Sequence, residues 1–176
     1  MLLLDACSII NLYTTGRMDA IIDEEDSVYG MVSSVQQEAL AVRRGGSGED
    51  AREFDPIDLS GMISRGALHV VVPTEAELAV FVEISQQLGD GEALSVAVAL
   101  ARGYAIVTDD RIAVRVIAGR VPVYPSLGII KAWVERQHLS RAAITAMLRD
   151  LRQRGSYVPG RNHQLRPWWD QYLGNG

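Results

Sequence analysis

The chain has 176 residues, and 48% of them are hydrophobic, which suffices for one domain with a sizeable core and excludes a disordered composition. A single cysteine, Cys7, excludes an internal disulfide and a thiolate zinc cluster, and it fits the reducing cytoplasm. The net charge of −5 argues against indiscriminate nucleic-acid binding, although 12 of the 17 basic residues follow residue 100. We expect neither a signal peptide nor a membrane span.

Five short apolar runs, at residues 2–5, 27–32, 67–73, 105–110 and 121–125, predict buried strands. Helical patterns lie between and after them, at 8–16, 35–44, 56–66, 75–88, 92–101 and 111–119. Pro56 fits the first turn of the third helix, and Thr74 and Glu77 form a capping box before the fourth. Residues 45–56 are polar and glycine-rich, which predicts a loop. The alternation predicts an α/β fold with a parallel central sheet of about five strands flanked by helices.

Two more helices are predicted after the fifth strand, at 127–138 and 141–155, and a less regular tail follows them. We therefore expect residues 1–130 to form the α/β domain and residues 131–176 to form a C-terminal helical extension packed on it. Trp168 and Trp169 in the tail either pin it to the core or stack on nucleic-acid bases.

Acidic side chains follow two of the predicted strands. Asp5 ends the first strand, and Asp109 and Asp110 end the fourth. Sites in open parallel sheets form at the carboxyl ends of strands, so these acids meet if the two strands are neighbours. Glu38, one turn into the helix at 35–44, can reach the same edge, and Glu92 reaches it if the loop before its helix folds back. Crowded carboxylates repel one another, which predicts a hard divalent cation, Mg²⁺ or Mn²⁺, among them.

Several segments together resemble the PIN-domain family over residues 1–130: "LLLDACSIINLY", Glu38, "DGEALSVAVALARGYAIVTDD" and "RIAVRVIA". The later "SLGIIKAWVE" and "RPWW" resemble a VapC-like ribonuclease subgroup with extra C-terminal helices. The resemblance implies a metal-dependent endoribonuclease whose catalytic acids are Asp5, Glu38, Glu92 and Asp110, with Asp109 as the alternative in the last position.

The same resemblance implies that Ser8 and Thr108 support the acids, and Asp90 lies beside them as a further candidate. An acidic cleft needs cations to hold a nucleic acid. Arg111 and Arg115 follow the last acids within about one helical turn, so we expect them to contact RNA phosphates.

The leading hypothesis is therefore metal-dependent hydrolysis of RNA phosphodiester bonds, and the resemblance adds a toxin role, an antitoxin partner and a homodimer as expectations. The alternative is a non-catalytic PIN-like scaffold that binds RNA or regulates a partner. Phosphoaspartyl chemistry is disfavoured, because the only lysine, Lys131, lies in a helix past the fifth strand and Cys7 stands where a second acid would be needed.

Overall fold

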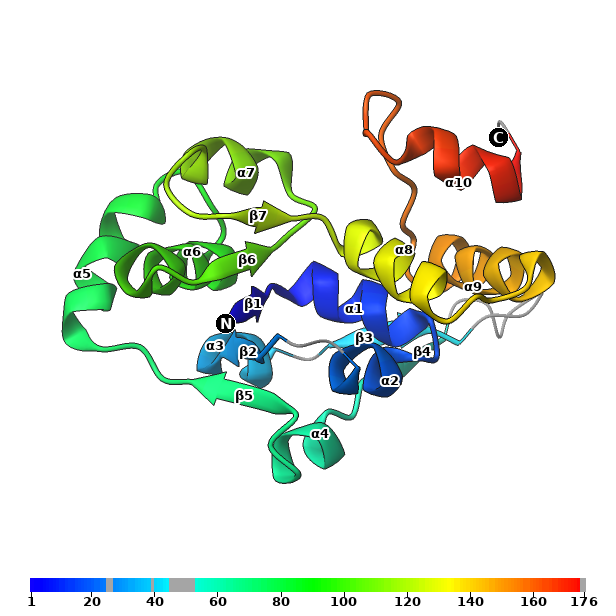
Figure 1. Ribbon diagram of the computed structural model, residues 1–176. Helices are drawn as coiled ribbons and strands as arrows, with labels where there is room; N and C mark the ends of the chain where they lie inside the picture. The colour runs from blue at the N-terminus through cyan, green and yellow to red at the C-terminus, as the bar shows by residue number, and fades with distance from the viewer. Residues whose placement is uncertain (25–26, 39, 45–52, 175–176) are drawn as a thin grey trace.

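The computed structural model describes residues 1–24, 27–38, 40–44 and 53–174, and its centre is a five-stranded sheet (Figure 1). The strands are β1 (Leu2–Leu4), β2 (Tyr29–Val32), β5 (Leu68–Val71), β6 (Ala105–Val107) and β7 (Val123–Tyr124), in the spatial order β5-β2-β1-β6-β7. Every neighbouring pair is parallel. Each strand lies within a predicted apolar run, and the predicted fold class is confirmed.

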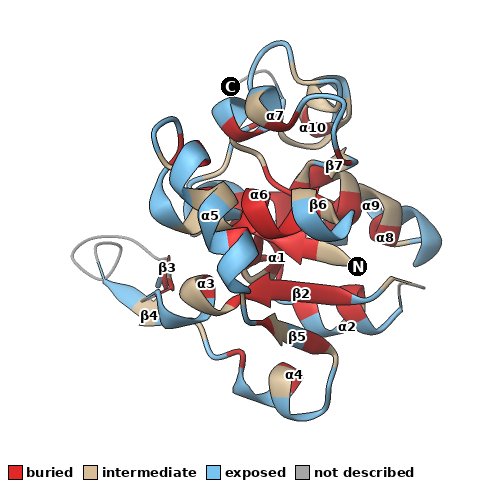
Figure 2. Ribbon diagram, turned by 90° about the vertical axis from the view of Figure 1, so that its left-hand side faces the viewer, coloured by how far each residue is buried: buried red, intermediate tan, exposed pale blue. Residues whose placement is uncertain are grey.

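The core lies between the sheet and the helices that pack on it. The helices before the last strand are α1 (Ala6–Thr14), α2 (Met18–Asp23), α3 (Ser33–Gln37), α4 (Ser60–Ser64), α5 (Glu75–Ile84), α6 (Asp90–Arg102) and α7 (Arg111–Ile117). The central helix α6 contacts β1, β2 and β6, and Figure 2 shows β2 and the middle of α6 as buried. Val96, Ala97 and Val98 are 0% exposed, as expected for a helix that is apolar all round.

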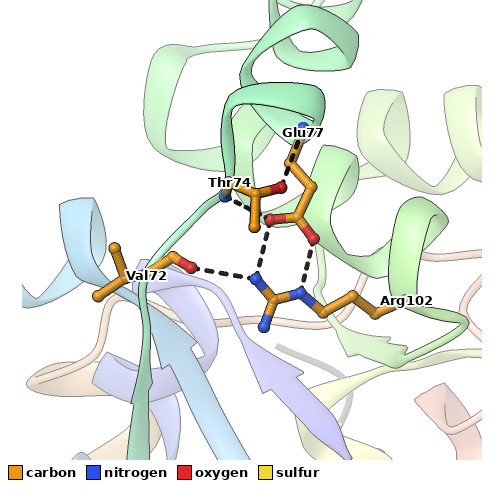
Figure 3. A network of polar contacts seen from close by, with 4 residues as sticks. All are labelled: Val72, Thr74, Glu77 and Arg102. Atoms are coloured by element: carbon orange, nitrogen blue, oxygen red, sulfur yellow. Dashed lines mark hydrogen bonds and ion pairs between the residues drawn. The ribbon is translucent and has the colours of Figure 1, made fainter.

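An ion pair joins the start of α5 to the end of α6 (Figure 3). The predicted capping box is present: the backbone N–H of Thr74 donates to Glu77 Oε2 at 2.7 Å, and the Glu77 N–H donates to Thr74 Oγ1 at 3.4 Å. Arg102 Nε and Nη2 donate to the two Glu77 oxygens at 2.6 and 2.8 Å. The Arg102 guanidinium holds the pKa of the buried Glu77 carboxyl at about 2, so the pair is charged over the ordinary pH range.

The segment after β2 differs from the prediction. The helix predicted at 35–44 is wrong: α3 ends at Gln37, and β3 (Ala41–Arg43) follows as a strand antiparallel to β4 (Phe54–Pro56). The start of a helix at Pro56 is also wrong, because α4 begins at Ser60. Of the predicted loop, residues 45–52 lie outside the described part of the chain.

The reason for the strand lies in distant partners. Val42 is 1% exposed, and β3 pairs with β4 in the register Val42↔Asp55. The Arg43 N–H donates to the Arg154 carbonyl oxygen at 3.2 Å, and Arg154 Nε donates back to the Arg43 carbonyl oxygen at 3.1 Å. Contacts made only in the tertiary structure therefore outweigh a local preference for helix, which amounts to less than about 1 kcal/mol per residue.

The C-terminal helices α8 (Ser126–Arg136), α9 (Arg141–Gln153) and α10 (Arg166–Leu173) follow the sheet. Both α8 and α9 contact α1, and α10 contacts α9. Figure 1 shows α1, α2, α8 and α9 gathered on the right and α5, α6 and α7 on the left. The division of the chain at residue 130 stays a prediction. Within the described residues, no helix has both the length and the apolarity needed to cross a membrane.

Candidate functional site

Asp5 joins β1 to α1 and is buried at the carboxyl edge of the sheet. It is the N-cap of α1: its Oδ1 accepts a hydrogen bond from the Ser8 N–H at 2.6 Å. Ser8 Oγ donates to the Val107 carbonyl oxygen at 2.8 Å and so ties α1 to the end of β6. Asp5 is 2% exposed, and its Oδ2 has no hydrogen-bond partner among the described residues. Asp5 therefore carries a buried oxygen that is available to a ligand.

The environment of Asp5 disfavours its charge. Burial raises the pKa of this carboxyl, the Thr108 hydroxyl and Ser8 lower it in part, and the charge of Asp109 raises it further. A cation placed beside Oδ2 would give this oxygen a partner and would offset the repulsion between Asp5 and Asp109.

Asp109 and Asp110 follow β6 but have different partners. Asp110 caps α7: its Oδ1 accepts from the N–H groups of Ile112 and Ala113 at 2.6 and 2.8 Å, and Thr108 Oγ1 accepts from the Asp110 N–H at 3.1 Å. In the described part of the chain, Asp110 Oδ2 has no hydrogen bond, so it too is available to a ligand.

Asp109 is instead held by three neutral donors from distant segments. Asn11 Nδ2 donates to its Oδ2 at 3.0 Å, Ser126 Oγ donates to the same oxygen, and the Tyr157 hydroxyl donates to Oδ1 at 3.3 Å. Burial and the charge of Asp109 raise the pKa of Tyr157, so the phenol keeps its proton for this bond. These bonds stabilise a carboxylate that lies close to Asp5.

Glu92 and Glu38 complete the group. Glu92 lies in the first turn of α6, and it is close enough to Asp5 and Asp110 for their charges to act on it. Burial raises the pKa of Glu92 to about 7, and the charges of Asp110, Asp5 and Glu38 contribute. Glu38 is exposed and directly follows α3, and partial burial raises the pKa of its carboxyl. Its Oε1 lies against Gly91, where any side chain would overlap it, so glycine allows Glu38 to reach over the start of α6.

The pKa of the Cys7 thiol is affected by several of these acids, which shows that they lie near one another. Burial raises the pKa of its thiol to about 11, and the charges of Asp5, Glu92, Asp109 and Asp110 all add to the rise. The donor chemistry and the charge of the cluster fit a hard divalent cation. However, in the parts of the chain that the structure describes, no three His, Cys, Asp or Glu side chains are close enough to hold a metal ion as they stand. Side-chain rotation is needed to bring three carboxylates onto one ion.

Other predicted residues lie outside this cluster. Asp90 is exposed at the start of α6, and among the described residues it makes no hydrogen bond with any of these acids. Arg111 and Arg115 are exposed on α7. Trp169 is 2% exposed and packs edge-on against Tyr157 with ring centroids 5.9 Å apart, so it pins the tail and is not accessible to a base.

The prediction missed the three side chains that hold Asp109. Asn11 had a detectable signal, because Ser8 and Asn11 follow Asp5 at spacings of three on a helix that is otherwise largely apolar. Ser126 directly precedes the apolar part of α8 and resembles an ordinary helix start. Tyr157 had no sequence signal, because its contact with Asp109 spans 48 positions.

The fold is thus a parallel α/β sheet that carries several carboxylates at its carboxyl edge. A family model described as a PIN domain matches residues 1–164, and the chain belongs to the PIN-domain family. PIN domains are generally nucleases, and this chain has their fold. No curated protein and no solved structure gave a match. The predicted family is thus confirmed, while the VapC-like subgroup stays a prediction.

Proposed function

We propose that the protein is a Mg²⁺- or Mn²⁺-dependent endoribonuclease. The observation that carries the proposal is the gathering of carboxylates from four separate segments: Asp5 after β1, Glu38 after α3, Glu92 at the start of α6, and Asp110 after β6. Burial, with a contribution from the charges of Asp110, Asp5 and Glu38, raises the pKa of Glu92 to about 7, and a divalent cation would offset this penalty on the charged form. Membership of a family of nucleases supports the same conclusion.

The roles follow from which oxygens lack partners. Asp5 Oδ2 and Asp110 Oδ2 lack hydrogen bonds among the described residues and would hold the metal together with Glu92. Glu38 would hold the metal from the open side or orient the attacking water. When bound, the cation supplies an activated water and offsets charge on the phosphate oxygens. Asp109 already accepts hydrogen bonds from three donors, so we assign it a supporting role beside Asp5.

The test replaces Asp5 by Asn and measures cleavage of a fluorescent single-stranded RNA pool in Mn²⁺. Changes in the outer partners of metal ligands typically alter activity about 10- to 100-fold, so loss of a direct ligand should lower it at least about 100-fold. Asp58→Asn is the matched control, since Asp58 is an exposed carboxylate that also accepts a backbone N–H, at 2.9 Å. Wild-type cleavage rates in Asp5→Asn would remove Asp5 from the mechanism.

One observation favours a second candidate, a non-catalytic PIN-like RNA-binding or regulatory scaffold. No three acids of the described chain are already placed to share an ion. Calorimetric titration with Mn²⁺, followed by the cleavage assay on the same sample, separates the two. Metal binding with no turnover on any RNA favours the scaffold, and turnover that requires the metal favours the nuclease.

We further propose a cytoplasmic toxin that acts as a homodimer and is inhibited by an antitoxin. An acidic cleft suits an inhibitor's arginine side chain, and the lone Cys7 suits a reducing compartment. Induced expression should arrest growth of a bacterial host, and Asp5→Asn should relieve the arrest. Light scattering of the purified protein measures the oligomeric state directly.

A further inference from the structure

A large cavity lies beside the acids and is walled on one side by the C-terminal segment 157–164. Its volume is about 890 Å³, and Thr108 and Asp109 form part of its lining, so it opens next to the candidate catalytic group. Arg111 and Val114 of α7 also line it. Figure 1 shows the C-terminal segment as the orange loop between α9 and α10. A cavity of this size lies within the range of about 300–1,000 Å³ typical of ligand sites.

The wall made by segment 157–164 is held in place at several points. Tyr157 donates to Asp109 at 3.3 Å and packs edge-on against the buried Trp169. Arg166 Nη1 donates to the Pro159 carbonyl oxygen at 3.0 Å, and Arg166 itself pairs with Asp170 at 2.8 Å. The segment is thus fixed to the acid cluster at one end and to α10 at the other.

Two arginines give the cavity a positive lining. Arg111 from α7 and Arg161 from the C-terminal segment both line it, and both are exposed. Neither has a hydrogen bond or an ion pair with any described residue, in contrast to the paired Arg166 nearby. Asp109 is the one acid in the described lining, and neutral donors already hold it. Guanidinium groups that lack protein partners are well suited to bind phosphate.

The rest of the lining combines apolar surface with hydrogen-bonding groups. Val114 is 40% and Val158 is 48% exposed, and both face the cavity with Pro159. Asn162 and Gln164 add amides.

His163 adds an imidazole ring to the polar groups of this wall. Its Nδ1 accepts the Leu165 N–H at 3.0 Å, so the neutral ring carries its proton on Nε2. Apolar faces beside amide and imidazole groups match the flat faces and polar edges of nucleobases.

We propose that this cavity binds the stretch of single-stranded RNA next to the scissile phosphate, with Arg111 and Arg161 on its phosphates. The inference rests on the proposed RNA cleavage and adds the C-terminal segment to the substrate site. An acidic peptide would use the two arginines but would leave the apolar strip of Val114 and Val158 uncovered. RNA uses both, and the cavity opens beside the acids that would cleave it.

The test measures binding of a fluorescent random-sequence 12-nucleotide RNA by anisotropy in EDTA, over a series of salt concentrations. Each phosphate contact on a single strand contributes about 0.7 to the slope of log affinity against log salt. Arg161→Ala should lower affinity about tenfold and reduce the slope by about 0.7, with partial recovery in Arg161→Lys. Arg149→Ala, an exposed arginine on α9 that does not line the cavity, is the control.

A second measurement locates the RNA without requiring cleavage. RNA that carries 4-thiouridine is photo-crosslinked to the wild-type protein, and the modified peptides are mapped by mass spectrometry. Crosslinks within 157–164 or α7 support the cavity proposal. If the protein shows these crosslinks but does not cleave RNA, only the catalytic proposal fails. If the wild type cleaves RNA while Arg161→Ala keeps its affinity and slope, the cavity proposal fails alone. Arg161-dependent binding of a poly-glutamate peptide with no effect on RNA also overturns it.

Discussion

Replacing Asp5 by Asn should make the metal-free protein more stable. The variant should also lose the stabilisation that Mn²⁺ gives the wild type. Asp5 is 2% exposed and its Oδ2 has no partner among the described residues. Asn keeps the oxygen that accepts the Ser8 N–H, and Asn is as good an N-cap as Asp. The substitution therefore removes an unpaired buried charge beside Asp109 without loss of the helix cap.

The magnitude follows from the cost of an unsatisfied buried polar group, which is about 1–3 kcal/mol and larger for a charge. Part of that cost remains, because the new amide also needs a partner, so we expect a gain of about 1–3 kcal/mol. In a protein of this size, 1 kcal/mol corresponds to about 2–4 °C in Tm, which predicts a rise of about 2–12 °C.

The sign depends on pH in a defined way. Burial raises the folded-state pKa of Asp5 above 3.8, so the folded protein holds this proton more tightly than the unfolded chain does. Wild-type stability therefore falls as pH rises above 3.8, and the advantage of Asn grows in the same direction. Calorimetry at pH 4.5 and pH 8, in EDTA and in Mn²⁺, measures both effects, with Asp58→Asn as the control. A lower Tm for Asp5→Asn in EDTA at pH 8, or an unchanged response to Mn²⁺, would refute the reasoning.

Three further predictions concern other parts of the chain. Burial raises the pKa of Glu92 from 4.5 to about 7, so the metal-free protein should lose stability as pH rises between these values. Urea unfolding should show that Glu92→Gln abolishes about 1–3 kcal/mol of this loss. Gly91→Ala should displace the Glu38 carboxylate and lower RNA cleavage about tenfold or more with Tm unchanged or raised; normal cleavage would exclude a role for the present position of Glu38. Arg102→Met should leave the buried Glu77 unpaired and lower the free energy of unfolding by about 1–3 kcal/mol, less than for a fully buried pair because Arg102 is 29% exposed; equal stability by urea unfolding would contradict this.

Several features were predictable because their causes are local. The five apolar runs become β1, β2, β5, β6 and β7. The central strands β1, β2 and β6 are largely buried, as their composition indicates, whereas the edge strand β7 is not, since Tyr124 is 45% exposed. The Thr74–Glu77 capping box opens α5, since both of its hydrogen bonds lie within four residues. Asp5 follows β1, and Asp110 is the N-cap of α7, so the positions of these two acids at element ends were also visible in the local sequence.

The arrangement of the acids was not predictable from local sequence. Asp5 and Asp110 lie at one edge because β1 pairs with β6, in the register Leu4↔Val107, across about a hundred residues of chain. Neither strand carries a signal for that neighbour, since parallel pairing is made by backbone groups common to every residue. The same applies to β3, where Arg154 supplies hydrogen bonds that turn a predicted helix into a strand.

The sequence by itself determined which segments are apolar enough to enter the core and which side chains carry negative charge, because hydrophobicity and charge are properties of individual residues. Only the tertiary structure decided which of those side chains meet. It left Asp5 Oδ2 without a partner, surrounded Asp109 with Asn11, Ser126 and Tyr157, and placed the C-terminal segment across a cavity beside them. These outcomes depend on contacts between residues far apart in the chain, whose energies exist only once the sheet has formed.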